Sequence, residues 1–147
     1  MGRDVKLLDC TLRDGGLVNS VHFSDDFVKA LYNTNTRSGI DYMELSYKAS
    51  STFFPKEEYG KGKFCDESNI RRVVDKFSKT MKIAVMDDIG RTNFKSDIIE
   101  KSDSLIDMIR IAVYAEGRKH CQRLITVKRE VMKLQLISWL YHWCLTT

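Results

Sequence analysis

Apolar residues recur along the first 114 positions in two alternating patterns, one typical of buried strands and one typical of amphipathic helices. Short apolar runs predict four strands, the first beginning at Lys6 and the others at residues 40–46, 82–87 and 106–113. Apolar positions at helical spacing predict intervening helices after Ser24, over residues 67–78 and around residues 96–101. The order β-α-β-α-β-α-β predicts an α/β fold with a parallel sheet, either half of a barrel or a small open sheet.

The end of the first predicted strand combines charge with glycine. Arg13 and Asp14 follow the strand and precede Gly15 and Gly16. Glycine lets a ligand approach the backbone closely. Parallel α/β folds place their chemistry at the carboxyl ends of strands, so Arg13 and Asp14 are candidate site residues. The alternative is a surface ion pair that contributes little to stability.

A second charged position, Glu44, interrupts the otherwise apolar strand 40–46. A carboxylate in such a strand needs a partner, or its pKa must rise. Glu44 is therefore either a site residue or half of an ion pair that only joins two strands. Asp87 and Asp88 end the third strand, where neighbouring side chains point to opposite faces. We expect these two acids to form a solvated turn rather than a metal site.

Composition divides the chain at about residue 114. The 147 residues suit one domain but are fewer than the roughly 250 of a closed eight-stranded barrel. Residues 1–114 hold 18 basic and 18 acidic side chains, whereas residues 115–147 hold six and two, so the net charge of +4 lies in the tail. The four cysteines form no CxxC pair, which predicts free thiols, and no apolar leader follows Met1. These features predict a cytoplasmic protein.

The stretch Asp9-Cys10-Thr11-Leu12-Arg13-Asp14-Gly15 resembles the first-strand signature of the metal-dependent lyases and aldolases called the DRE-TIM superfamily. The doubled glycine is most similar to the branch of 4-hydroxy-2-oxovalerate aldolase. Further similarity covers about residues 5–114, and it includes the segments 38–45, 59–66, 82–86 and 106–113. The resemblance implies that residues 1–114 are the first four βα units of a (β/α)8 TIM barrel, followed by an atypical tail at 115–147.

The resemblance also implies an activity. This family cleaves or forms a carbon–carbon bond beside a carbonyl, and this branch cleaves 4-hydroxy-2-oxo acids to pyruvate and an aldehyde. By resemblance, Asp14 is a ligand of Mg²⁺ or Mn²⁺, Arg13 stabilises the enolate, and Glu44 positions Arg13. The implied partner is a small 2-oxo acid, with neither nucleic acid nor membrane. The open edge of a half-barrel also predicts association between copies of the chain.

Three departures from the family pattern predict that this chain by itself lacks full activity. The histidines, which are His22, His120 and His142, form no His-x-His pair of metal ligands. Leu17 stands where the aldolases have a base. Ser46 replaces the glycine that usually follows two residues after the acid of the second strand. The alternative to a lyase is therefore a non-catalytic half-barrel fragment or interaction protein.

Two other functions fit the residues less well. Asp9 at a strand end resembles the nucleophile of haloacid-dehalogenase-like phosphatases, but Thr11 stands where that family has a second aspartate. Residues 60–63, Gly-Lys-Gly-Lys, faintly resemble a phosphate-binding loop without the required Walker spacing. Neither function is expected.

The tail permits two interpretations. Apolar residues between Leu124 and Cys144 recur at helical spacing, which predicts an amphipathic helix. The second interpretation is a shifted reading frame. The genetic code forces the triplet across Met132 and Lys133 to encode glutamate, and permitted codons elsewhere can give Gly-Tyr-Glu-Thr-Thr-Ala-Asn, which resembles the family's next strand. Together with the change in composition, this favours a frameshifted end.

Overall fold

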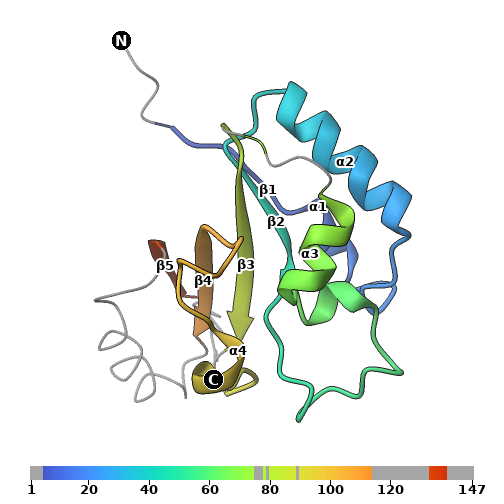
Figure 1. The fold of residues 1–147 in the computed structure, drawn as a ribbon, viewed down its shortest axis with the longest axis vertical. Helices are drawn as coiled ribbons and strands as arrows, with labels where there is room; N and C mark the ends of the chain where they lie inside the picture. The colour runs from blue at the N-terminus through green and yellow to red at the C-terminus, as the bar shows by residue number, and fades with distance from the viewer. Residues whose placement is uncertain (1–4, 75–77, 79, 89, 114–132, 139–147) are drawn as a thin grey trace, which may run out of the picture.

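Five parallel strands form a single sheet in the computed structural model, which describes residues 5–74, 78, 80–88, 90–113 and 133–138. Figure 1 shows the strands, which are β1 (Leu8–Asp9), β2 (Tyr42–Tyr47), β3 (Lys82–Asp88), β4 (Met108–Val113) and β5 (Lys133–Ser138). Each strand pairs in parallel with the next along the chain. The predicted α/β class with a parallel sheet is confirmed.

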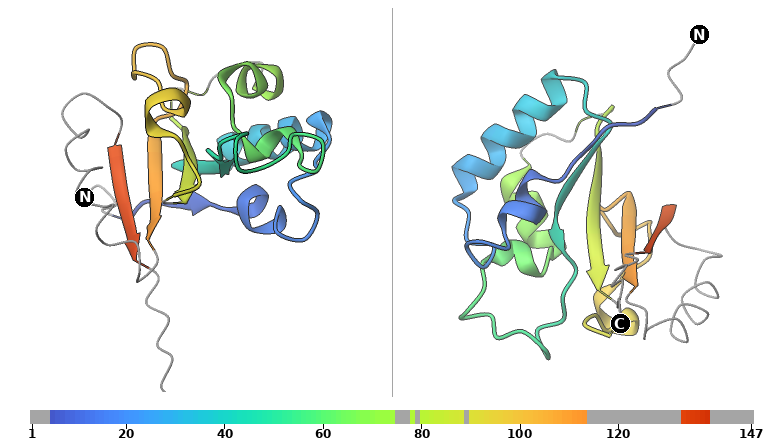
Figure 2. Two further views of the ribbon diagram at one scale, coloured as in Figure 1. Left: turned by 90° about the horizontal axis from the view of Figure 1, so that it is seen from below. Right: turned by 180° about the vertical axis from the view of Figure 1, so that it is seen from behind.

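The two longest helices lie on the same side of the sheet, away from β5 (Figures 1 and 2). They are α2 (Asp25–Arg37) and α3 (Glu67–Val73), and the shorter elements are α1 (Thr11–Gly15), the 3₁₀ turn η1 (Lys61–Lys63) and α4 (Phe94–Asp97). Helix α2 begins where the sequence predicts, because the Ser24 hydroxyl accepts a hydrogen bond from the Phe27 amide at 3.3 Å. Two aspartates in its first turn favour the same start.

The main hydrophobic core lies between the sheet and these helices. Alternate strand residues point into it because successive side chains of a strand face opposite sides. The strand members of this core are Met43, Leu45, Ile83, Val85, Ile109 and Ile111, and they pack with helix residues such as Tyr32, Ile70 and Val73. The opposite face of the sheet has two small apolar clusters, which leave room for charged side chains between them.

Several predicted boundaries differ from the structure. Strand β1 is only two residues long, because the chain turns into α1 at Thr11. Helix α3 ends at Val73 rather than Ser78, and α4 covers Phe94–Asp97 rather than residues 96–101. The solvated turn expected at Asp87 and Asp88 is wrong. Pairing of β3 with β4 continues to Asp88, and both acids are buried.

The helix expected in the tail is wrong for residues 133–138, which form β5. This strand pairs with β4 over six residues, from Met108 with Lys133 to Val113 with Ser138. An open sheet edge offers unpaired backbone groups, and pairing with them outweighs the helical spacing of the apolar residues. Strand β5 is formed by residues 133–138 of the printed sequence, and not by a sequence in the shifted frame. The rest of the tail lies outside the described residues. The shifted frame stays a prediction.

Candidate active site

Glu44 lies at the centre of a charged cluster on the face of the sheet opposite the helices. Its side chain is fully buried, and three groups surround one carboxylate oxygen. Arg110 donates to Glu44 Oε2 at 2.7 Å, Arg13 Nε donates at 3.2 Å, and the Cys10 thiol lies at 3.3 Å. Two cations thus compensate a carboxylate that would otherwise be unpaired in the sheet.

Arg13, which lies in α1 just after β1, joins two carboxylates, those of Asp14 in the same helix and Glu44 within β2. Its Nη1 atom lies 2.9 Å from Asp14 Oδ1, while its Nε atom contacts Glu44. Burial opposes the charged form of Arg13. Its pKa is nevertheless raised by the negative charge of Glu44, by a hydrogen bond with Tyr47 and by the negative charge of Asp14. The structure therefore brings together Arg13, Asp14 and Glu44, the three residues singled out in the sequence, and keeps Arg13 cationic.

Arg110 is a member of the cluster that sequence reasoning missed. It lies in β4 between two buried isoleucines, Ile109 and Ile111. The sequence feature that could have identified Arg110 is the same as for Glu44, namely a charged residue inside an apolar strand. Its side chain reaches Glu44 across β3, where the residue in register with Glu44 is Ala84. Because alanine has a small side chain, it leaves room for that contact.

The Cys10 thiol is held in its neutral form. Burial, together with the charge of Glu44 and a hydrogen bond to it, raises the pKa of Cys10 to about 11. A thiol with this pKa is a weak donor and a poor nucleophile near neutral pH. Cys10 therefore contributes to the site by bonding Glu44, and not as a nucleophile.

Lys63, another residue without a predicted role, is buried among aromatic rings. Its ammonium nitrogen lies 4.1 Å from the ring centre of Tyr47, 4.3 Å from that of Phe54 and 5.4 Å from that of Tyr59. These distances are typical of cation–π contacts. Burial lowers the pKa of Lys63. Lys63, within residues 60–63, is therefore engaged by aromatic rings.

Asp87 and Asp88 have different partners, as expected for neighbours in a strand. Asp87 accepts a short hydrogen bond from the Thr92 hydroxyl, and burial raises its pKa to about 6. Asp88 lies 3.6 Å from Arg91, and burial raises its pKa as well. The two carboxylates do not form a shared site.

The described residues do not complete a metal site. Asp14 supplies carboxylate oxygens, and its side chain is 57% exposed, but Oδ1 already pairs with Arg13. Within the described ranges, no group of three or more His, Cys, Asp or Glu side chains is placed to hold a metal ion. Leu17 is 68% exposed and offers no base. His22 is exposed and contacts the Glu58 carbonyl at 3.3 Å.

Comparison with known proteins supports the fold and gives a limited indication of function. No protein-family model matches the chain, and no curated protein matches it. The structure is similar to that of the N-terminal domain of a "putative aldolase" from Bacteroides vulgatus, with a TM-score of 0.66 and 27% sequence identity. The match covers 91% of this chain and 44% of that one, so this chain spans less than half the length of its neighbour.

None of the described helices combines the length and the apolar character that a membrane-spanning segment requires.

Proposed function

We propose that this chain is the N-terminal part of an aldolase-type carbon–carbon lyase that acts on 2-oxo acids. The observation that carries the proposal is the buried Glu44 carboxylate in β2, which binds Arg13 just after the carboxyl end of β1. The similarity to an N-terminal domain named as an aldolase supports the same class of reaction. The finer assignment, cleavage of a 4-hydroxy-2-oxo acid to pyruvate and an aldehyde, follows the sequence resemblance described above.

In the proposed reaction, Arg13 stabilises negative charge on the substrate. Cleavage of the bond between carbons 3 and 4 leaves its electron pair on carbon 3, and this pair delocalises onto the carbonyl oxygen as an enolate. A guanidinium that is fixed before the reaction stabilises such an oxygen without reorganising. Glu44 acts through Arg13 and is therefore a positioning residue. Protonation of carbon 3 then gives pyruvate.

The described residues do not by themselves supply two groups that the reaction needs. A base must remove the proton of the 4-hydroxyl group, and Leu17 cannot do so. A bound Mg²⁺ or Mn²⁺ would polarise the carbonyl group, and Asp14 would supply part of its coordination. Since such ions take about six ligands, several of which can be water, Asp14 is insufficient by itself.

A coupled assay tests the proposal. Pyruvate release from a 4-hydroxy-2-oxo acid is followed with lactate dehydrogenase and Mn²⁺, using the 147-residue chain and a longer version. In the longer version, the codons after residue 114 are read in the shifted frame described above. The chain would then continue into the further strands that the resemblance implies. We expect no measurable activity from the short chain and metal-dependent pyruvate release from the long one.

The outcomes separate the parts of this proposal. Activity in the short chain would contradict the incomplete site, and inactivity in a folded longer version would contradict the aldolase assignment. Arg13→Gln and Asp14→Asn in the longer version are expected to lower activity by at least about a hundredfold. Exposed Asp103→Asn is the matched control for the second variant and is expected to leave activity unchanged.

A further inference from the structure

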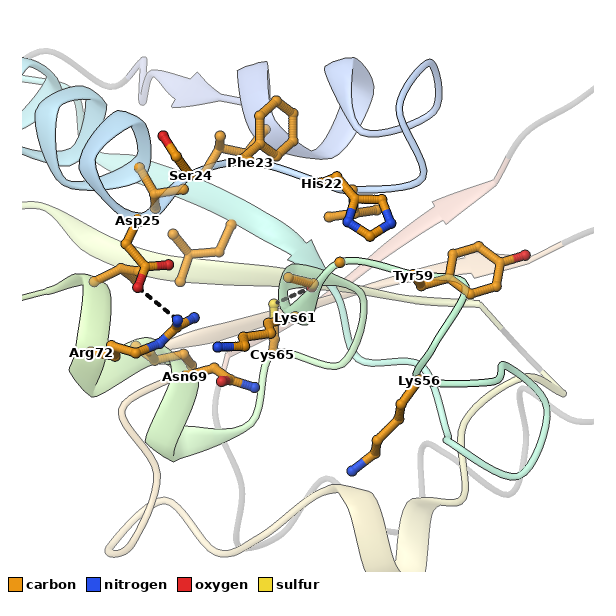
Figure 3. A pocket seen from close by; sticks show the side chains of 18 residues that line it. His22, Phe23, Ser24, Asp25, Lys56, Tyr59, Lys61, Cys65, Asn69 and Arg72 are labelled. Carbon is orange, nitrogen blue, oxygen red and sulfur yellow. Dashed lines mark hydrogen bonds and ion pairs between the residues drawn. The ribbon is translucent and has the colours of Figure 1, made fainter.

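A cavity of about 510 Å³ lies on the helix side of the sheet, next to the N-terminus of α2, helix α3 and two loops (Figure 3). Its apolar lining includes Leu12, Leu45, Ile70 and Val73. Small-molecule sites in proteins typically have volumes of about 300–1,000 Å³ and a mostly apolar lining with a few polar groups. This cavity has the size and lining of such a site.

The cavity is separate from the charged cluster around Glu44. Leu12 and Leu45 are the sequence neighbours of Arg13 and Glu44, but their side chains belong to the hydrophobic core on the helix side. Neither Arg13 nor Glu44 lines the cavity. A ligand bound here would therefore lie behind the candidate active site rather than within it.

Polar side chains around the cavity carry excess positive charge. Lys56, Lys61 and Arg72 line it, together with one acid, Asp25, which pairs with Arg72 at 2.6 Å. Among the described residues, no carboxylate pairs with Lys56 or Lys61. The Lys56 ammonium group lies over the Phe64 ring, 5.7 Å from its centre, so Lys61 is the cation that remains available beside the apolar cavity. This arrangement is complementary to an anion with an apolar body.

Arg72 provides a second indication of a ligand. Its Nε atom is buried and has no hydrogen-bond partner within the described residues, although the other end of the side chain binds Asp25. Buried donors in native proteins are almost always paired with protein, water or ligand. An anionic ligand oxygen would satisfy this donor.

The wall formed by the two loops is fixed by close packing. Val21, which lines the cavity and is buried, has a φ of 64°, a conformation that is rare for a β-branched residue. It is held against Gly60, whose amide donates to the Ser20 carbonyl at 2.9 Å. A Cβ atom at Gly60 would lie 1.9 Å from the Val21 carbonyl oxygen, so only glycine permits this contact. Because these two loops are already ordered in the free protein, binding costs less conformational entropy.

We propose that this cavity binds a small organic anion, consisting of an apolar body and one carboxylate or phosphate group. The apolar body would contact Leu12, Leu45 and Ile70, and the anionic group would face Lys61 and the free Nε donor of Arg72. This site is independent of the proposed aldolase reaction, because it shares no residue with the charged cluster.

Titration calorimetry on the 147-residue chain tests the site with four probes. They are 3-phenylpropionate, phenyl phosphate, the neutral 3-phenylpropanol and inorganic phosphate. We expect at least one of the two aromatic anions to bind, and the tighter one identifies the head group. The alcohol should bind about tenfold more weakly than that anion, because it cannot pair with the cations. Inorganic phosphate should also be weaker, because it lacks an apolar body.

Variants separate this site from general attraction of anions to the surface. Lys61→Gln should weaken binding about two- to fivefold, as expected for one exposed charge. Lys82→Gln makes the same charge change at an exposed position outside the cavity and should leave binding unchanged. Asn69→Trp, which places a large side chain at the cavity wall, should abolish binding while the protein still unfolds cooperatively.

Three outcomes would overturn the proposal. The first is the absence of binding by both aromatic anions at about 10 mM. The second is equal affinity for the alcohol, and the third is an equal loss of affinity in Lys61→Gln and Lys82→Gln.

Discussion

The two faces of the sheet both contain fully buried residues but differ in chemistry. In β2, Met43 and Glu44 are adjacent, and each has 0% of its surface exposed. Met43 packs in the apolar core beneath the helices, whereas Glu44 binds two arginines and a thiol on the opposite face. Burial therefore does not identify the role of a residue in this protein.

The stability of each face depends on a different property. The helix side depends on filled volume, because its residues interact through non-directional contacts. The charged side depends on the pairing of Glu44 Oε2 with two arginines, because a buried ion that loses its partner remains desolvated and uncompensated. Substitutions that preserve shape but alter charge should distinguish the two faces.

The largest expected effect is that of Glu44→Gln, compared with Met43→Leu. Both changes nearly preserve side-chain volume. Glu44→Gln leaves Arg110 without its carboxylate partner and Arg13 with only the exposed Asp14, so we expect the free energy of unfolding to fall by about 3–5 kcal/mol. Met43→Leu should lower it by less than about 1.5 kcal/mol. Urea denaturation measures both, and equal losses would contradict the proposed difference between the faces.

A double-mutant cycle tests the missed residue, Arg110. Arg110→Met removes the 2.7 Å contact with Glu44 and should lower the free energy of unfolding by about 1–3 kcal/mol. In the Glu44→Gln background the same change should be less harmful, giving a coupling energy of about 0.5–3 kcal/mol. Additive effects would show that the two side chains do not interact in solution.

Asp87, on the helix side of the sheet, makes the free energy of unfolding depend on pH. Burial raises its pKa from 3.8 to about 6, so the folded protein holds this proton more tightly than the unfolded chain does. Protonation of Asp87 therefore stabilises the fold at pH 4, and this contribution is lost as the pH rises to about 6. The stability of the wild type relative to Asp87→Asn should fall by on the order of 2–3 kcal/mol between pH 4 and pH 7.

The control for this pH dependence is Asp103→Asn, because Asp103 is exposed. Its stability relative to the wild type should not change over the same interval. If Asp87→Asn behaves as this control does, Asp87 is ionised in the folded protein and the argument from burial fails.

The remaining prediction concerns the reactivity of Cys10. With a pKa of about 11, its alkylation by iodoacetamide at pH 8 should be on the order of a hundredfold slower than that of a free thiol. Because the charge of Glu44 contributes to this pKa, Glu44→Gln should accelerate the reaction. Cys65, fully buried with a pKa of about 12, is the internal control and should stay unreactive in both proteins. Mass spectrometry of the modified peptides measures both sites.

The sequence predicted the helix side of the fold well, because periodic apolar residues report directly on a buried surface. It also predicted that Arg13, Asp14 and Glu44 would cluster, and the structure brings them together. The catalytic and metal-binding roles assigned to them remain predictions. Pattern alone could not predict that Arg110 contacts Glu44 across β3, because this contact depends on strand order and on the small side chain of Ala84.

The errors of prediction share a physical cause. Asp87 and Asp88 look solvated in the sequence because acids are usually exposed, yet pairing with β4 carries them into the buried sheet. Residues 133–138 have helical periodicity, yet the open edge of β4 recruits them as a strand. In both places a long-range backbone contact outweighs a local preference, and such contacts are not encoded in local spacing.

The central claim is that Arg13 stabilises an enolate while Glu44 holds it in place. Exchange of the methyl protons of pyruvate with deuterated water, followed by NMR in the longer version with Mn²⁺, measures enolate formation without the aldehyde. We expect Arg13→Gln to slow exchange by about 10²–10³-fold, Glu44→Gln to slow it less, and Met43→Leu to leave it unchanged. Exchange at the wild-type rate in a folded Arg13→Gln variant would contradict the claim.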